Sequence, residues 1–400
     1  MSLLPVDEAI AAILRRVPVP VAETVSLAEA AGRVLFEPIV ATHDQPPFDS
    51  SAMDGFAVRA ADVIEGQRLK VAGVSQAGAG YAGALRPGEA VRIFTGAPLP
   101  VGADTVIMQE LAVADGGFVS FTSPARPGHS VRLLGSDFRH GQELVAIGSR
   151  LTPMHLAVAA AANAATVNVA RRPRVALLAT GDELVLPGEP LGPAQIVASN
   201  SYGLRPMFAP YADAVTDHGI ARDDRHALRG TLAGILDGEP DLLVTTGGAS
   251  VGDHDIVQEI LVDLGVTLDF WRINMRPGKP LMFGTRGKTL IFGLPGNPVS
   301  AMVTALIFIK PALRATLGFP EPTPWRLPLA AATPPNTARR HFMRARLLHT
   351  PTGPELMPIS QTDSGHTSSM ANADMLIVQP ENDPGQPAGA IVEACPIDAF

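Results

Sequence analysis

The stretch LLVTTGGASVGDHD (residues 242–255) decides the fold, because it joins a continuous apolar run to a glycine-rich turn. An apolar run without alternation is typical of a strand buried on both faces, as in a parallel sheet. VALLATGDEL (175–184) and TLIFGLPGNP (289–298) repeat the pattern, and amphipathic helices are expected between such runs at His226–Leu236 and Ile256–Leu264. Strands that alternate with helices predict an α/β domain with a parallel-rich sheet.

The flanking sequence predicts further domains. Short apolar runs separated by glycine and proline indicate β-structure on both sides of the α/β segment. Helices are expected at residues 3–16, at Ser26–Leu35 behind a capping serine, at residues 151–166 behind Thr152, and at Val299–Ile309 behind Asn297. The fold class is therefore multidomain α/β plus β. Four domains are expected: a helical connecting domain (1–44 and 139–170), an inserted β-rich domain (45–138), the α/β domain (171–321) and a small C-terminal β-barrel (322–400).

Composition excludes several classes of protein. A hydrophobic content of 46% and a charged content of 18% argue against global disorder. The net charge of −8 argues against a nucleic-acid or anionic-membrane partner. The single cysteine, Cys395, cannot form a disulfide framework or a thiolate metal site within one chain. Because no signal peptide is evident and the apolar stretch Ala301–Ile309 is too short to span a bilayer, we expect a cytoplasmic protein.

Chemistry is expected at the carboxyl ends of the strands, where α/β sheets bind ligands. Asp182 and Glu183 follow the first strand and could hold Mg²⁺, although Asp182 could equally cap a turn. The backbone N–H groups after Gly247 and Gly248 could cradle a phosphate, although a plain loop would look similar. His254 without a partner at ligand spacing is more often structural.

Basic residues are concentrated at RINMRPGKP (272–280), in an otherwise acidic protein. Arg272, Arg276 and Lys279 suit an oxyanion or phosphate, while the alternative is a solvated positive face. Asp224 precedes a helix, where it could be no more than a cap. Motifs for serine hydrolases and zinc proteases are absent from the sequence.

Five motifs, taken together and in their order along the chain, are specific enough to indicate a protein family. PPFDSSAMDGFAV (46–58) is followed by TGDEL (180–184), TTGGASVGDHD (245–255), RPGKP (276–280) and GLPGNPVSA (293–301). Over nearly the whole chain this order resembles the molybdopterin molybdenumtransferase family, which includes MoeA and the gephyrin E domain. The resemblance implies a homodimer that inserts molybdate into adenylylated molybdopterin, depends on Mg²⁺ and releases AMP.

The resemblance also implies roles for individual residues. Glu183, Asp223 and Asp255 would position Mg²⁺ and, together with Asp54 and Asp137, would be catalytic. The substrate-binding residues implied by the motifs are Thr95, Arg132, Gly247, Gly248, Ser250, Arg272, Arg276, Lys279, Pro295 and Pro298. Those from the inserted domain would come from the other subunit, which makes the active site a shared one. Other molybdenum-cofactor biosynthesis proteins are possible partners.

Two alternatives stay open on the sequence. A molybdopterin adenylyltransferase resembles the same α/β domain, but it would lack the inserted and C-terminal domains. A non-catalytic pterin-binding scaffold would share every domain. The family's chemistry is compatible with a chain that has one cysteine, because the substrate's own dithiolene sulfurs hold the molybdenum.

Overall fold

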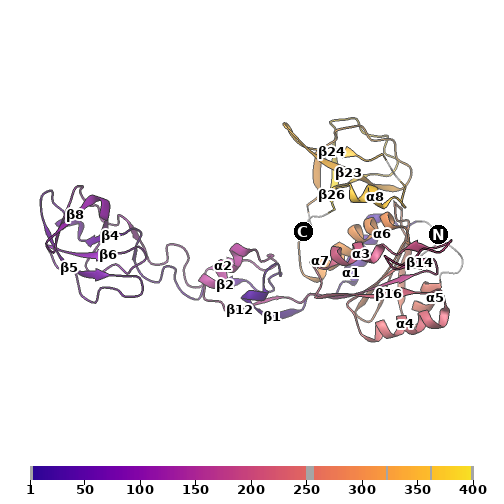
Figure 1. The fold of residues 1–400 in the computed structure, drawn as a ribbon, viewed down its shortest axis with the longest axis horizontal. Helices are drawn as coiled ribbons and strands as arrows, with labels where there is room; N and C mark the ends of the chain where they lie inside the picture. The colour runs from indigo at the N-terminus through magenta and orange to yellow at the C-terminus, as the bar shows by residue number, and fades with distance from the viewer. Residues whose placement is uncertain (1–2, 249–255, 321–322, 361–362, 398–400) are drawn as a thin grey trace. The chain divides into compact units, whose positions relative to one another are not determined.

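The chain forms two compact units, seen in a computed structural model that describes residues 3–248, 256–320, 323–360 and 363–397 (Figure 1). Contacts between Cα atoms define an α/β unit, residues 1–23 and 170–400, and an inserted unit, residues 24–169. This grouping joins residues 1–23 to the α/β unit, and the division into four domains stays a prediction.

A mixed sheet of six strands forms the centre of the α/β unit. Its strands lie in the order β16 (Ala214–Ala221), β13 (Arg174–Thr180), β17 (Leu242–Thr246), β21 (Thr289–Leu294), β20 (Pro280–Arg286) and β18 (Thr267–Arg272). The first four are parallel, β20 pairs antiparallel with β21, and β18 pairs antiparallel with β20. Every residue of β17 and β21 is buried, which confirms the prediction from their unbroken apolar runs.

Helices cover both faces of this sheet. They are α1 (Val6–Arg16), α3 (Asn200–Phe208), α4 (Arg225–Asp237), α5 (Ile256–Asp263), α6 (Pro298–Thr304) and α7 (Lys310–Thr316). Leu228 and Leu232 of α4 and Ile260 of α5 pack with Leu243 and Ile291 of the sheet. Figure 1 shows α4 and α5 together on one side of the sheet, with α3, α6 and α7 on the other. The predicted α/β architecture is confirmed.

The apolar helical run is longer than the sequence suggested. A π-helical turn, Ala305–Ile309, joins α6 to α7, so that Pro298–Thr316 forms 19 continuous helical residues. That length would suffice to span a membrane, contrary to the expectation from residues 301–309. However, 67% of its most apolar window is buried inside the fold, as in the core helix of a soluble protein.

The C-terminal residues form the predicted small barrel. Its strands are β22 (Trp325–Pro328), β23 (Arg340–Thr350), β24 (Gly353–Pro358), β25 (Met375–Gln379) and β26 (Ile391–Pro396), with the helix α8 (Thr367–Ala371) beside them. They pair in the order β24, β23, β25, β26, β22. A bridge between Leu329 and Leu356, where Ala330 N donates to Leu356 O at 2.8 Å, closes the ring. The strand β19 (Met275–Arg276) follows β18 along the chain but pairs with β23, so it belongs to the sheet of the barrel.

A second six-stranded sheet dominates the inserted unit. Its order is β7 (Thr105–Met108), β4 (Gly55–Val58), β6 (Glu89–Ile93), β5 (Leu69–Ser75), β9 (Phe118–Phe121) and β8 (Ala112–Asp115), with short 3₁₀ turns at Ala60–Asp62 and Gln109–Leu111. The apolar runs predicted as strands are strands. Beside the sheet, β3 (Ser50–Ser51) pairs with β10 (Val131–Arg132).

The rest of the inserted unit contains less helix than expected. Helix α2 (Pro153–Ala161) begins behind Thr152, whose Oγ1 accepts from His155 N, as predicted. The short strands are β1 (Ala22–Ser26), β2 (Ile39–Val40), β11 (Glu143–Val145) and β12 (Thr166–Ala170). The expected helix Ser26–Leu35 is wrong, because only a 3₁₀ turn, Leu27–Glu29, follows β1. Ser26 Oγ donates to the Glu29 carboxylate, and Leu27 N donates to Ala165 O, which ties this turn to the chain just before β12.

Candidate functional site

A cavity lies at the carboxyl ends of the parallel strands, as the sequence predicts for this fold. It encloses about 170 Å³ and is here named the strand-end pocket. Thr180, Gly247 and Gly296 line its base, and the paired strands β14 (Leu184–Val185) and β15 (Ile196–Val197) lie along one side. The predicted residues that line it are Glu183, Gly247 and Pro298.

Gly247 is required by the backbone at this site. Its φ is +88°, in the left-handed region that only glycine adopts without cost. A Cβ at this position would collide with the carbonyl oxygen of Thr180 on the neighbouring strand. Gly248, at φ +67°, would similarly collide with the Val257 side chain. The glycines therefore let the turn after β17 pass close to β13.

Carboxylates gather next to this pocket. Asp223 N donates to Asp182 Oδ1 at 3.1 Å, so Asp182 bridges two loops. Arg222 Nη1 donates to the carbonyl oxygens of Asp182 and Leu184 at 2.7 and 3.2 Å, which fixes the same turn. Burial, followed by the charges of Asp182 and Glu183, raises the pKa of Asp223. Burial is the larger cause of this raised pKa, and a cation beside Asp223 would favour the ionised carboxylate against both burial and the neighbouring charges.

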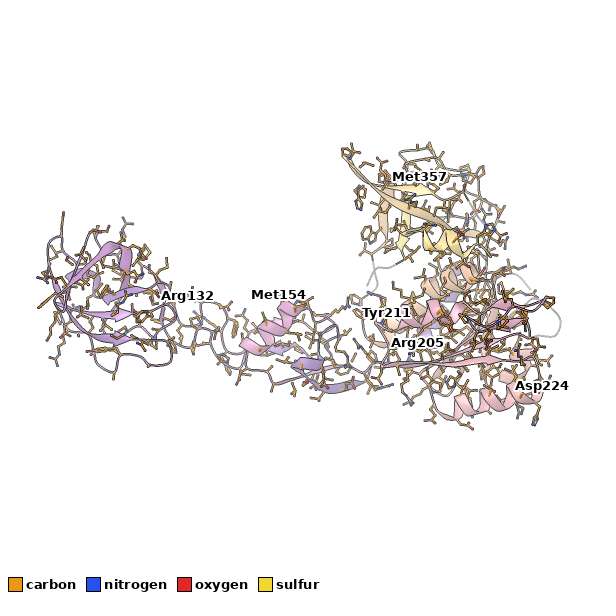
Figure 2. The ribbon with its side chains drawn as sticks, viewed as in Figure 1. Arg132, Met154, Arg205, Tyr211, Asp224 and Met357 are labelled. Carbon is orange, nitrogen blue, oxygen red and sulfur yellow. The ribbon has the colours of Figure 1, made fainter. Side chains whose placement is uncertain are left out.

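Asp224, the next residue, does not join this group of carboxylates but caps a helix. Its carboxylate accepts from Ala227 N at 2.7 Å and caps α4, where Figure 2 labels it at the start of the helix. Asp224 is therefore a cap, as one reading of the sequence had it. Within the described residues, no three carboxylate, imidazole or thiol side chains converge as a ready-made metal site.

A second cavity, here named the basic pocket, encloses about 460 Å³ between the loop after β19 and the barrel strand β23. Arg276 and Lys279, both predicted, line it together with Pro295. The sequence did not predict His341 and Arg344, which lie on β23, or Arg339, which directly precedes that strand. The signal was present in RRHFMR (339–344), where three arginines and a histidine lie within six residues and both His341 and Arg344 are buried. Of the described residues that line this pocket, Asp363 is the one carboxylate.

The basic pocket carries positive charge in a partly buried setting. Burial lowers the pKa of the Arg276 and Arg344 guanidiniums, which nevertheless stay protonated at neutral pH. Arg344 Nη1 donates to Ser369 Oγ at 2.7 Å and to Asp363 O at 3.2 Å. Burial and the Arg276 charge lower the pKa of His341 to about 4, so its ring is neutral at pH 7. Such a pocket favours an anion.

The two pockets share a residue. Asn297 lines both, and its Nδ2 donates to Ser364 Oγ of the C-terminal region at 2.9 Å. The expectation that the Asn297 side chain caps the following helix is therefore wrong, since that side chain is used to tie α6 to the barrel region. Ligands in the two pockets would be neighbours.

Other predicted residues lie apart from these pockets. Arg272 lines neither of them, and its Nε is buried without a hydrogen-bond partner in the described part of the chain. Ser250, His254 and Asp255 lie outside the described residues. Arg132, on β10, and Asp137 are exposed within the inserted unit, where Figure 2 labels Arg132.

The inserted unit does bring Asp54 and Thr95 together. Asp54 Oδ1 accepts from both the N–H and the Oγ1 of Thr95, at 2.7 and 2.8 Å. These two bonds stabilise the ionised carboxylate and lower its pKa below the ordinary 3.8. Asp54 is thus held as an acceptor, and the Thr95 hydroxyl proton is already used.

Acidification should release this contact only at low pH. Because the folded-state pKa of Asp54 is lowered, its stabilising effect is present above the ordinary pKa and is lost as the pH falls through the lowered one. We expect the Thr95 amide resonance, followed by NMR during a pH titration, to shift with a midpoint below 3.8. Asp54→Asn should remove that titration. A midpoint at or above 3.8 would show that the two bonds do not form in solution.

Three stretches of the chain match known protein families. Residues 4–163 match the MoeA N-terminal region (domains I and II). Residues 176–315 match a probable molybdopterin binding domain, and residues 326–397 match the MoeA C-terminal region (domain IV). The matches follow one another along the chain in the order that the motifs predict.

Named relatives agree with these matches. A molybdopterin molybdenumtransferase from a Nostoc species is 40% identical over 300 residues, 73% of this chain and 69% of that protein. The Bacillus subtilis protein of the same name is 32% identical over an alignment of 424 residues that covers 98% of this chain and 93% of the relative. A crystal structure of a molybdopterin biosynthesis MoeA protein from Pyrococcus horikoshii aligns over all of both chains with a TM-score of 0.86 and 31% identity. Similarity over nearly the whole chain argues against the adenylyltransferase, which would lack two of the domains.

Proposed function

The chain belongs to the family of MoeA-type molybdopterin molybdenumtransferases, and on that premise we propose that its basic pocket receives molybdate while the strand-end pocket receives part of the adenylylated pterin. The family's reaction inserts molybdenum into molybdopterin. One observation carries the assignment of the pockets: Asn297 lines both, so an oxyanion and a pterin bound there would be adjacent.

The basic pocket suits a tetrahedral dianion. Arg276, Lys279, Arg339 and Arg344 supply the charge, and among the lining residues that the structure describes only Asp363 opposes it. Guanidinium groups donate hydrogen bonds in a planar fork that matches oxyanions. In a protein of net charge −8, this local field is what draws the anion in. Arg272, outside both pockets, stays a predicted oxyanion ligand without further support.

The pterin's dithiolene sulfurs would hold the molybdenum, because the chain offers no thiolate for that purpose. Its single cysteine, Cys395, lies on β26 in the barrel. Burial, followed by the charge of Glu393, raises the pKa of this thiol, which keeps it protonated and unreactive. The protein's contribution is therefore to bind and orient two anionic substrates.

Mg²⁺ fits the acidic residues beside the strand-end pocket. Mg²⁺ in proteins is typically held by one or two carboxylates together with substrate phosphates, so a ready-made group of three ligands is not needed. Glu183 and Asp223 would hold it, and a bound cation would offset both the burial and the charges of Asp182 and Glu183 that raise the pKa of Asp223. Asp255 stays a predicted third ligand. When bound, the ion would neutralise charge on the phosphate from which AMP leaves.

We further propose that a second copy of the chain completes the site. Four exposed apolar side chains, Phe48, Met53, Leu133 and Leu134, flank Asp54 and Arg132 and are between 41% and 59% exposed. The pairing of β3 with β10 brings both groups to one edge of the inserted unit. An apolar strip around polar site residues is typical of an interface. Sedimentation velocity should give a dimer that Leu133→Asp converts to a monomer; a monomeric parent protein would contradict the shared site.

A cytoplasmic location completes the proposal. The most apolar helical run, Pro298–Thr316, is mostly buried within the fold. A chain with one cysteine has no disulfide framework to maintain in an oxidising compartment.

The test is anaerobic AMP release from adenylylated molybdopterin with purified protein and Mg²⁺, measured with and without molybdate. We expect release that depends on molybdate, and we expect Arg276→Ala to weaken molybdate binding measured by calorimetry. Arg286→Ala is the matched control, because Arg286 is bonded to Asp237 away from both pockets. AMP release that does not depend on molybdate would contradict the assignment of the pockets. So would an equal loss of molybdate affinity in Arg276→Ala and Arg286→Ala. A protein that binds pterin without turnover would instead be the scaffold alternative.

A further inference from the structure

His341 occupies a particular position at the floor of the basic pocket. It is the second residue of β23, and the parallel pairing of β19 with β23 places it opposite Arg276. Its relative exposure is 4%, although it lies among Arg276, Arg339 and Arg344. A buried histidine among three arginines is unusual, because protonation of its ring would add another positive charge to the same place.

The hydrogen bond between His341 and Arg276 fixes the state of the imidazole. Arg276 Nη2 lies 3.1 Å from His341 Nδ1. A guanidinium has donors and no acceptor, so Nδ1 must accept in this contact, and the proton of the neutral ring is on Nε2. The burial that lowers the pKa of His341 to about 4 keeps the ring neutral at pH 7.

Gln379 lies on the other side of the same nitrogen. Its Nε2 donates to Pro334 O at 2.7 Å, which points its Oε1 toward the ring, 3.3 Å from His341 Nδ1. A proton on Nδ1 would therefore bond to Gln379 and end the contact with Arg276. The Arg276 contact is the shorter of the two and is charge-assisted, which favours the bare Nδ1.

Arg276 depends on this bond for its orientation. Its Nε is buried without a partner, and the bond to His341 is the one side-chain hydrogen bond that the described residues give its guanidinium. A long side chain without such a bond would populate several rotamers. With Nη2 held by His341, the other terminal nitrogen is free for the pocket.

We propose that His341 is a positioning residue, which accepts a hydrogen bond from Arg276 and thereby orients that guanidinium toward the anion. The inference rests on the proposed function, in which the basic pocket binds molybdate. His341 itself need not touch the anion. Its neutral ring lets the four cationic side chains of the pocket, three of them arginines, converge without adding a fifth charge.

The test is a double-mutant cycle read out as molybdate affinity by calorimetry. His341→Phe keeps a buried ring but removes the acceptor, and we expect the molybdate Kd to rise about tenfold. His341→Asn should restore most of the affinity, because its Oδ1 can accept from Arg276. In an Arg276→Ala background, His341→Phe should change the Kd less than about twofold, since the group it positions is gone. His349→Phe, an exposed site on the same strand, is the matched control.

The outcomes separate the inference from the proposed function. If the parent protein does not bind molybdate, or Arg276→Ala has no effect, the proposed function fails. If both behave as expected but His341→Phe binds normally, or weakens binding equally without Arg276, the positioning role is wrong. A long-range ¹H–¹⁵N NMR spectrum of the parent protein at pH 7 needs no variant: it should show a bare Nδ1 at His341, and a protonated Nδ1 would overturn the inference.

Discussion

An Asp223→Asn variant is expected to lose about 100-fold or more in molybdate-dependent AMP release while melting at the same or a higher temperature than the parent protein. The loss follows because Asn keeps the size of the side chain but removes the charge proposed to hold Mg²⁺, whose contribution is several kcal/mol. The gain in stability follows from the sign of the pKa shift. A carboxyl whose folded pKa is raised destabilises the fold when ionised, so its removal relieves the cost of burying the charge and, second, the repulsion from Asp182 and Glu183.

Asp224 is the matched control for this variant. It is the adjacent residue and also a carboxylate, but it caps α4. Asp224→Ala should therefore lower the free energy of unfolding by about 1 kcal/mol and leave AMP release per folded molecule unchanged. The two substitutions thus predict opposite phenotypes from neighbouring positions. Thermal melts and AMP chromatography on both variants measure this, and turnover by Asp223→Asn at the parent rate would remove Asp223 from the mechanism.

The parts of the fold that the sequence predicted are those set by local pattern. The strands β13, β17 and β21 were predictable because burial on both faces requires an unbroken apolar run. The start of α4 was predictable because aspartate is a preferred N-cap residue and Asp224 directly precedes the amphipathic pattern. The carboxyl-end location of the strand-end pocket followed from the topology of parallel sheets.

Tertiary contacts account for what the sequence did not predict. Arg339, His341 and Arg344 reach the basic pocket only because β19 pairs with β23, and Arg276 and His341 are 65 residues apart in sequence. No local period encodes that pairing. The same reason explains the error at Asn297, whose side chain bonds to Ser364 instead of capping its own helix.

The failed helix at Ser26–Leu35 shows tertiary structure overriding propensity. Ser26 and Glu29 have the spacing of a helix start, and in the structure they do bond to each other. However, the chain enters this segment as strand β1, and Ala30 and Leu35 pack into the core of the inserted unit. Gly32, at φ +72°, then turns the chain out of any helical path. A serine and a glutamate with capping spacing therefore predict a helix only weakly when the residues that follow them lack apolar side chains at helical spacing.

The second large effect is expected from Gly247→Ala. The variant should lose roughly 3 kcal/mol in the free energy of unfolding of the α/β unit, because a Cβ adds left-handed backbone strain and a collision with Thr180 O. The collision must push the turn after β17 away from β13, and this turn forms the base of the strand-end pocket. Binding of adenylylated molybdopterin, measured anaerobically by calorimetry, should fall below detection, while molybdate still binds to the basic pocket.

Gly296→Ala provides the comparison that makes this result interpretable. Gly296 lines the same pocket, but its φ is not in the left-handed region, and among the described residues an added Cβ would meet only Gly247 Cα at 3.8 Å, an ordinary contact. Its unfolding free energy should stay within about 1 kcal/mol of the parent value, since removing a glycine also restricts the unfolded chain. If the pocket merely needed small side chains, both variants would lose pterin binding and keep their stability. Because the fold requires the left-handed backbone conformation of Gly247, Gly247→Ala should lose both stability and pterin binding. Gly296→Ala should keep both.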